Sequence, residues 1–158
     1  MRKIFMTLVI AGLTMVAVAP PAVADSREEV MERFMGKWDI TEGVSFGTPI
    51  PGEELDGSIT VITKDTITTY DRDENMTYQA KYVLNTQADP MEIDMVATKS
   101  GIEMKVLAIV KFEWLDLDGD NEFQLAYSLI PGERPKDFTS LIGSKILTME
   151  LEQYENDD

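Results

Sequence analysis

Alternation of apolar and polar residues dominates the chain from about residue 36 onward and predicts β-strands. Apolar side chains recur at every second position, and Gly, Pro, Asn and Asp separate the runs. This pattern is typical of antiparallel strands that bury one face. It predicts eight strands, at residues 37–41, 58–63, 66–72, 76–84, 91–95, 104–115, 122–128 and 145–153.

A short helix is predicted before the first strand. Ser26 and Glu29 have the spacing of a capping box, in which both side chains accept hydrogen bonds from backbone N–H groups at the start of a helix. Val30 and Phe34 follow four residues apart, on one face of such a helix. We therefore expect a helix over about residues 27–35.

Two strands contribute most of the predicted core. The strand at 76–84 is apolar on one face, which is formed by Met76, Tyr78, Ala80, Tyr82 and Leu84. The strand at 104–115 is apolar along one face, and Leu107 and Ile109 make the middle of its other face apolar too. We expect the middle of this longest strand to be covered on both sides.

Most strands are joined by short turns, although the connections at 44–57 and 130–144 are long. Eight sequential strands can remove their exposed edges by closing into an up-and-down barrel. The sequence therefore predicts a mainly β fold, an antiparallel eight-stranded up-and-down barrel over residues 36–153. The short helix lies within residues 25–35, and an acidic tail follows at 154–158. A two-sheet β-sandwich of the same strands is the alternative.

Residues 1–24 have the pattern of a secretory signal peptide. Arg2 and Lys3 precede an apolar run at 4–18, and small residues lead to a cleavage site before Asp25. The apolar run is short for a bilayer span, and no second run of about 18 apolar residues follows it. We expect an exported protein, periplasmic or extracellular, with no membrane insertion after cleavage.

Composition narrows the chemistry that this domain can support. The chain has 158 residues, 29 acidic and 14 basic side chains, a formal net charge of −15, no histidine and no cysteine. Disulfides, a thiol nucleophile, a Ser-His-Asp triad and an ordinary zinc site are therefore excluded. The negative charge repels phosphate backbones, so we expect no nucleic-acid partner. We also expect no cofactor and no enzymatic activity.

Four segments, at residues 35–38, 47–55, 117–120 and 131–138, are similar in order and residue type to one known family. The most specific of them is Gly-Glu-Arg-Pro-x-x-Phe, which starts at Gly132. The chain thus resembles the planctomycete-type lipocalin-like family, small exported domains of uncharacterised function. The resemblance implies a lipocalin-like barrel and no particular reaction. Many members carry a cysteine where this chain has Ala126 and Tyr127.

A clasp at one barrel end is the first candidate feature. Trp38 is similar to the Gly-x-Trp tryptophan of true lipocalins, whose indole closes one barrel end beneath a basic side chain. Arg134 is the candidate partner, because a guanidinium can stack on an indole face for about 0.5–2 kcal/mol. Pro135 and Phe138 are expected to hold the same loop in place. We interpret these four residues as structural.

An apolar pocket inside the barrel is the candidate binding site. Methionine adapts to ligands of irregular shape, and a tyrosine hydroxyl can hold one polar end. The residues expected to line it are Tyr78, Tyr82, Met95, Met104, Phe112 and Tyr127. The same residues also suit a core filled by its own side chains, and the pattern leaves both interpretations open.

Two further motifs are weaker. Asp116, Asp118 and Asp120 place carboxylates around a glycine, which superficially suits calcium. The bidentate glutamate of an EF-hand is missing, and Asp-Gly is ordinary turn chemistry, so we expect a plain turn and no metal. Residues 43–47 have the spacing of a nucleophile elbow, but no histidine can activate Ser45.

These features lead to two hypotheses. The first is an exported, non-enzymatic lipocalin-like domain that binds a small apolar or amphipathic molecule inside its barrel. The second is a protein-interaction or structural module of the cell envelope, with a filled core and with the loops at 44–57 and 130–144 as its contact surface. The volume of the cavity inside the barrel discriminates between them.

Overall fold

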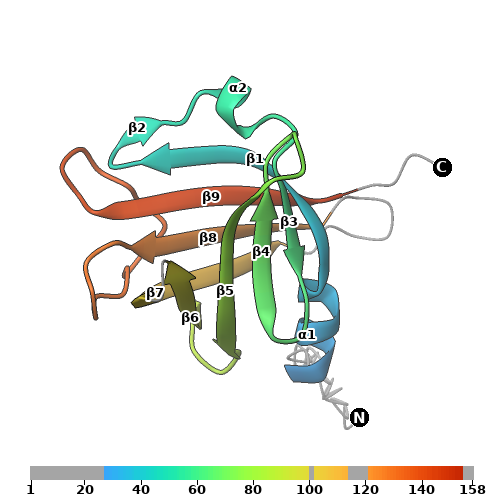
Figure 1. Ribbon diagram of the computed structural model, residues 1–158. Coiled ribbons are helices and arrows are strands. Elements are labelled where there is room, and N and C mark those ends of the chain that lie inside the picture. Colours follow the sequence, from blue (N-terminus) through green and yellow to red (C-terminus); the bar gives the residue numbers. More distant parts are fainter. Residues whose placement is uncertain (1–26, 100–101, 114–120, 155–158) are drawn as a thin grey trace, which may run out of the picture.

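The computed structural model describes residues 27–99, 102–113 and 121–154 (Figure 1). The expected signal peptide, the acidic turn at 116–120 and the tail after residue 154 lie outside these ranges. The described elements are α1 (Arg27–Phe34), β1 (Gly36–Ser45), β2 (Thr48–Pro49), α2 (Gly52–Leu55), β3 (Ile59–Ile62), β4 (Thr66–Tyr70), β5 (Met76–Asn85), β6 (Met91–Lys99), β7 (Ile102–Glu113), β8 (Glu122–Ser128) and β9 (Ile146–Gln153).

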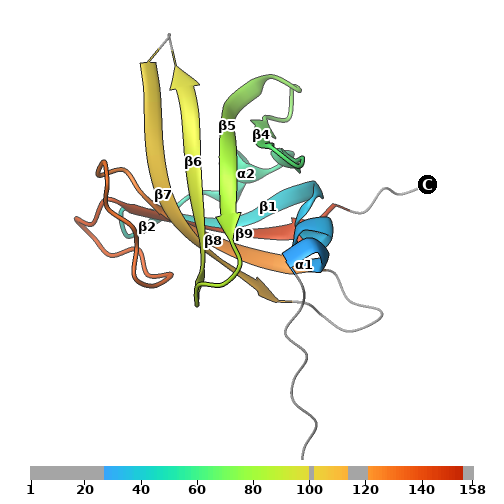
Figure 2. The same cartoon turned by 90° about the horizontal axis from the view of Figure 1, so that it is seen from below.

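The predicted eight-stranded barrel is confirmed. Strands β1, β3, β4, β5, β6, β7, β8 and β9 are hydrogen-bonded in that order, all antiparallel, and β1 pairs with β9 to close the sheet. The β-sandwich alternative is therefore wrong. The extra strand β2 pairs with the end of β1. Two views at right angles show the strands wrapped around a common interior (Figures 1 and 2).

A bulge in β1 lets the first strand serve two neighbours. Residues 36–39 pair with β3, and residues 38–45 pair with β9. The register with β9 shifts between Ile40 and Glu42, so one extra residue bends the strand there. This bend joins the two edges of the sheet and so removes them.

The N-terminal helix covers one end of the barrel (Figure 1). Phe34, at its last position, is 1% exposed and makes edge contacts with three aromatic rings, those of Tyr82, Phe112 and Phe123. The indole N–H of Trp38 donates a hydrogen bond of 3.1 Å to the Phe34 carbonyl. These contacts stabilise a helix that would be too short to persist alone. The helix agrees with the prediction to within one residue.

The middle of β7 is covered on both sides, as its pattern predicts. Its inward residues belong to the barrel core, and Ile109, which faces outward, is 2% exposed. The connection from β8 to β9 lies against this outer side, and its Pro135 is buried (Figure 2). The outward apolar residues therefore form a second, smaller packing layer.

The connection at 44–57 contains regular structure that the pattern did not predict. Strand β2 and helix α2 have two and four residues, too few for a hydrophobic period to be recognised. Among the described residues, no helix is long and apolar enough to cross a bilayer.

Candidate functional site

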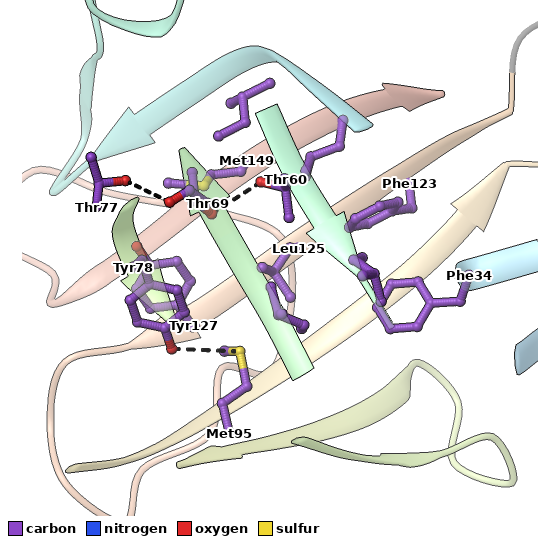
Figure 3. Close-up of a pocket in the computed structure, with 14 residues that line it drawn as sticks. Phe34, Thr60, Thr69, Thr77, Tyr78, Met95, Phe123, Leu125, Tyr127 and Met149 are labelled. Carbon is purple, nitrogen blue, oxygen red and sulfur yellow. Dashed lines mark hydrogen bonds between the residues drawn. The ribbon is translucent and has the colours of Figure 1, made fainter. Parts of the chain in front are cut away.

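A cavity of about 210 Å³ lies inside the barrel (Figure 3). Its lining comes from α1 and from most of the barrel strands, and every described side chain that lines it is uncharged. The cavity has two chemically different ends.

The deep end is aromatic and aliphatic. Phe34 and Phe123 lie together here with Ile62, Ile67 and Leu151, and all five are almost fully buried. Phe34 closes the end of the cavity that α1 covers. A ligand cannot enter through this end without displacing the buried ring of Phe34. The deep end therefore offers dispersion contacts and no hydrogen bond.

The opposite end carries hydroxyl groups and is partly exposed. The side chains of Thr60 and Thr69 are hydrogen-bonded through their hydroxyls at 3.1 Å, and the hydroxyl of Thr77 donates to the backbone carbonyl of Thr69 at 3.2 Å. Thr77 is exposed, and Thr69 is half-buried. Figure 3 shows Thr69 and Thr77 on the side of the cavity away from Phe34 and Phe123, with Thr60 between them and Phe123. The mouth of the cavity is therefore polar but uncharged.

Two tyrosines complete the mouth. The hydroxyl of Tyr78 donates a long hydrogen bond of 3.9 Å to the sulfur of Met95. The hydroxyl of Tyr127 has no hydrogen-bond partner among the described residues. Burial, with a smaller effect from Tyr78, raises the pKa of Tyr127 to about 12. Burial also raises the pKa of Tyr78. Both phenols are therefore protonated at neutral pH, and the Tyr127 proton is available to a ligand.

Three of the six residues expected in the pocket line it, namely Tyr78, Met95 and Tyr127. The other three, Tyr82, Met104 and Phe112, do not line it. Tyr82 and Phe112 face inward, but the ring of Phe34 packs against both and occupies the space in front of them. The Tyr82 hydroxyl donates to the carbonyl of Thr63 at 2.8 Å, outside the cavity lining.

Met104 lies outside the pocket because the start of β7 extends past the barrel. Residues 102–105 are all exposed, and Met104 itself is 45% exposed. Figure 2 shows the β6–β7 pair projecting beyond the other strands. Strand alternation assigns a face to Met104, but it does not say where the barrel interior ends.

The pattern missed several lining residues, above all the threonines. Thr77 stands on the outward face by simple alternation, but the pairing of β4 with β5 shifts between Thr69 and Tyr70. The shift places Thr77 as an extra residue in β5, and such a bulge redirects a side chain. Thr60 and Thr69 could have been found from the inward positions of their strands, where polar residues interrupt an apolar face.

The prediction that Arg134 stacks on Trp38 is wrong, because the two residues have other partners. Trp38 is fully buried, and its ring packs edge-on against Phe123 at 4.7 Å. Arg134 lies instead on the outside of the barrel, where its guanidinium donates to the carbonyls of Ile93 and Ala108 and to the carboxylate of Asp94. The guanidinium does tie the loop to strand carbonyls, but on β6 and β7.

The other residues of the expected clasp stay with the loop. Pro135 is buried and Phe138 is half-buried, both within the connection between β8 and β9. That they hold the loop in place stays a prediction. The weak cation candidates Asp116, Asp118 and Asp120 lie outside the described residues. No group of three or more side chains able to hold a metal ion occurs among the residues that the structure describes.

Comparison of the chain with protein-family models, with curated proteins and with solved structures found no match. The resemblance to the planctomycete-type lipocalin-like family stays a prediction.

Proposed function

We propose that this protein is an exported, non-enzymatic binding protein that holds a small apolar or amphipathic molecule inside its barrel. The observation that carries the proposal is the uncharged cavity of about 210 Å³. A water molecule occupies roughly 30 Å³ in the liquid, so the cavity is several times larger than the volume of one or two water molecules. An engineered apolar cavity of roughly 150 Å³ is sufficient to bind benzene.

The two ends of the cavity support an amphipathic ligand. The buried ring of Phe34 closes an apolar end, and the hydroxyls of Tyr78 and Tyr127 stand at the partly exposed end. A ligand would enter with its apolar part first and leave its polar atom at the tyrosines. Pockets with this distribution, mostly apolar with a few convergent polar groups, are the usual form of small-molecule sites.

Methionine methyl NMR tests the proposal directly. Met95 and Met149 line the cavity, whereas Met104 is exposed outside it. We expect ethylbenzene to shift the methyl signals of Met95 and Met149 and to leave that of Met104 unchanged. Leu125→Trp, which fills the cavity from β8, should abolish these shifts. Unchanged Met95 and Met149 signals at saturating ethylbenzene would refute binding in the barrel.

A second candidate function is protein interaction at the cell envelope, and one surface favours it. Leu141 and Ile142, in the connection between β8 and β9, are 64% and 89% exposed. They lie beside Gly47 in the other long connection. Ile142→Asp should release a partner that co-elutes with the wild-type protein from its own host, while ethylbenzene binding stays unchanged. A partner that remains bound to this variant would exclude this surface.

A further inference from the structure

We propose that the ligand is an uncharged molecule about the size of a single six-membered ring with one short substituent, and that an oxygen of this substituent accepts a hydrogen bond from Tyr127. This inference rests on the proposed binding function and specifies its ligand class. Three properties of the cavity lead to it: its size, its lack of charge and the hydroxyl proton of Tyr127, which no described residue accepts.

Size sets the upper limit. The cavity of about 210 Å³ is somewhat larger than the cavity of roughly 150 Å³ that accepts benzene. The excess accommodates a substituent of a few atoms on one ring. A second ring, or a long acyl chain, would have to displace Phe34 or Phe123 at the deep end, which are almost completely buried, or project from the mouth into water, where it gains no contact with the lining. Interiors are close-packed, so such displacement is expensive.

The lining excludes a charged ligand. All the described side chains that line the cavity are neutral, including the threonines and tyrosines of the mouth. A carboxylate or an ammonium group would be buried there without a counter-charge, which costs several kcal/mol or forces the group to become neutral. The net charge of −15 on the whole chain further disfavours anions.

The hydroxyl groups at the mouth specify where the polar atom lies. The Tyr78 proton is directed at the sulfur of Met95, and the Thr77 proton is directed at a backbone carbonyl. The Tyr127 hydroxyl keeps its proton at neutral pH and donates it to no described residue. A ketone, aldehyde or ether oxygen that reaches the mouth would therefore find a donor. A hydrocarbon would gain only the apolar contacts.

Four probes of related shape test the inference by methionine methyl NMR. They are acetophenone, ethylbenzene, benzoate and 4-acetylbiphenyl, and the Met95 and Met149 signals report occupancy. On the wild-type chain we expect acetophenone to bind, and benzoate and 4-acetylbiphenyl to bind at least tenfold more weakly. These comparisons test charge and size without any variant.

Tyr127→Phe tests the hydrogen bond. The variant keeps the ring and removes no hydrogen bond made by the described residues, so the fold should be retained. We expect it to weaken acetophenone binding about fivefold, because one neutral hydrogen bond is lost. The affinity for ethylbenzene should change less than twofold. Tyr82→Phe is the matched control, because its hydroxyl bonds to Thr63 outside the lining. It should change neither affinity.

The outcomes separate this inference from the proposed function. Equal acetophenone affinity in the wild type and Tyr127→Phe would overturn the assigned hydrogen bond. Tighter binding of benzoate or 4-acetylbiphenyl than of acetophenone would overturn the ligand class. In both cases the barrel would still be a binding site. If none of the four probes moves the Met95 and Met149 signals, the binding function itself is refuted.

Discussion

The guanidinium of Arg134 binds the carboxylate of Asp94, forty residues earlier in the chain, and holds the β8–β9 connection against the outside of β6. The same guanidinium donates to the carbonyls of Ile93 and Ala108, and its Nε atom lies 3.5 Å from a carboxylate oxygen of Glu92. The Arg134 side chain is 23% exposed, so these bonds are partly shielded from water. One side chain therefore connects a long loop to two strands.

Replacing Arg134 with Ala should lower the free energy of unfolding by about 1–3 kcal/mol, because charge-assisted hydrogen bonds are lost and strand carbonyls lose a donor. Arg134→Lys should recover only part of this, since an ammonium lacks the planar fork that reaches two carbonyls and a carboxylate together. Urea denaturation measures both. Lys136→Ala, at an exposed position of the same segment, is the control. Equal midpoints for all the variants would show that Arg134 does not hold the loop.

The pH dependence of stability should report on Asp94. Burial alone would raise the pKa of Asp94, but hydrogen bonds and positive charge from Lys105 and Arg134 outweigh burial and hold the pKa below 3.8. A carboxylate with a lower pKa in the folded state stabilises the fold above its unfolded pKa, and this contribution is lost as the pH falls through the folded pKa.

The difference in unfolding free energy between the wild type and Asp94→Asn should therefore be constant from pH 7 to about pH 5 and shrink below about pH 4. Urea denaturation at a series of pH values measures it. In an Arg134→Ala background the pH-dependent part should become smaller, since one source of the lowered pKa is gone. A difference that stays constant down to pH 2 would contradict the assignment.

Phe34 should be among the most sensitive core positions. Its ring contacts those of Tyr82, Phe112 and Phe123, and its removal leaves a void at the end of the barrel that α1 covers. Phe34→Ala should lower the free energy of unfolding by about 3–5 kcal/mol. Glu32→Ala, on the exposed side of the same helix, should change it by less than about 0.5 kcal/mol. Similar effects of the two substitutions in chemical denaturation would show that α1 is not docked through Phe34.

Comparing alanine substitutions at Gly47 and Gly132 distinguishes the cost of a steric clash from the cost of backbone strain. Both have positive φ angles, +80° and +78°, which are unfavourable for a residue with a Cβ atom. A Cβ atom at Gly47 would lie 2.2 Å from the backbone nitrogen of Ile142, whereas one at Gly132 meets nothing within 4 Å. Gly132→Ala should destabilise the fold by about 1–2 kcal/mol. Gly47→Ala should lower the free energy of unfolding by more than Gly132→Ala does. It should also shift the backbone NMR signals of Leu141 and Ile142. Equal effects would argue against close contact between the two loops.

Sequence periodicity was sufficient for the eight barrel strands and for most of their faces. Alternation placed Tyr78, Met95 and Tyr127 on inward faces, and the absence of free edges in a closed sheet made a barrel the natural arrangement. The helix before the first strand followed from its capping residues and from Val30 and Phe34. These features depend on neighbours within a few residues, which is the range over which a sequence pattern is informative.

The contents of the cavity and the partner of Arg134 were decided by tertiary structure. Alternation assigned Tyr82 and Phe112 to the interior, but only the docking of α1 showed that Phe34 fills the space before them. Arg134 meets Asp94 because the seventeen-residue connection between β8 and β9 lies against β6 and β7, a placement that no local pattern encodes. Alternation with a period of two residues predicts on which face of a strand a side chain lies. It does not predict how far along the barrel axis the residue lies, where a bulge such as the one at Thr77 occurs, or which path a loop takes. These depend on register and packing between residues far apart in the chain.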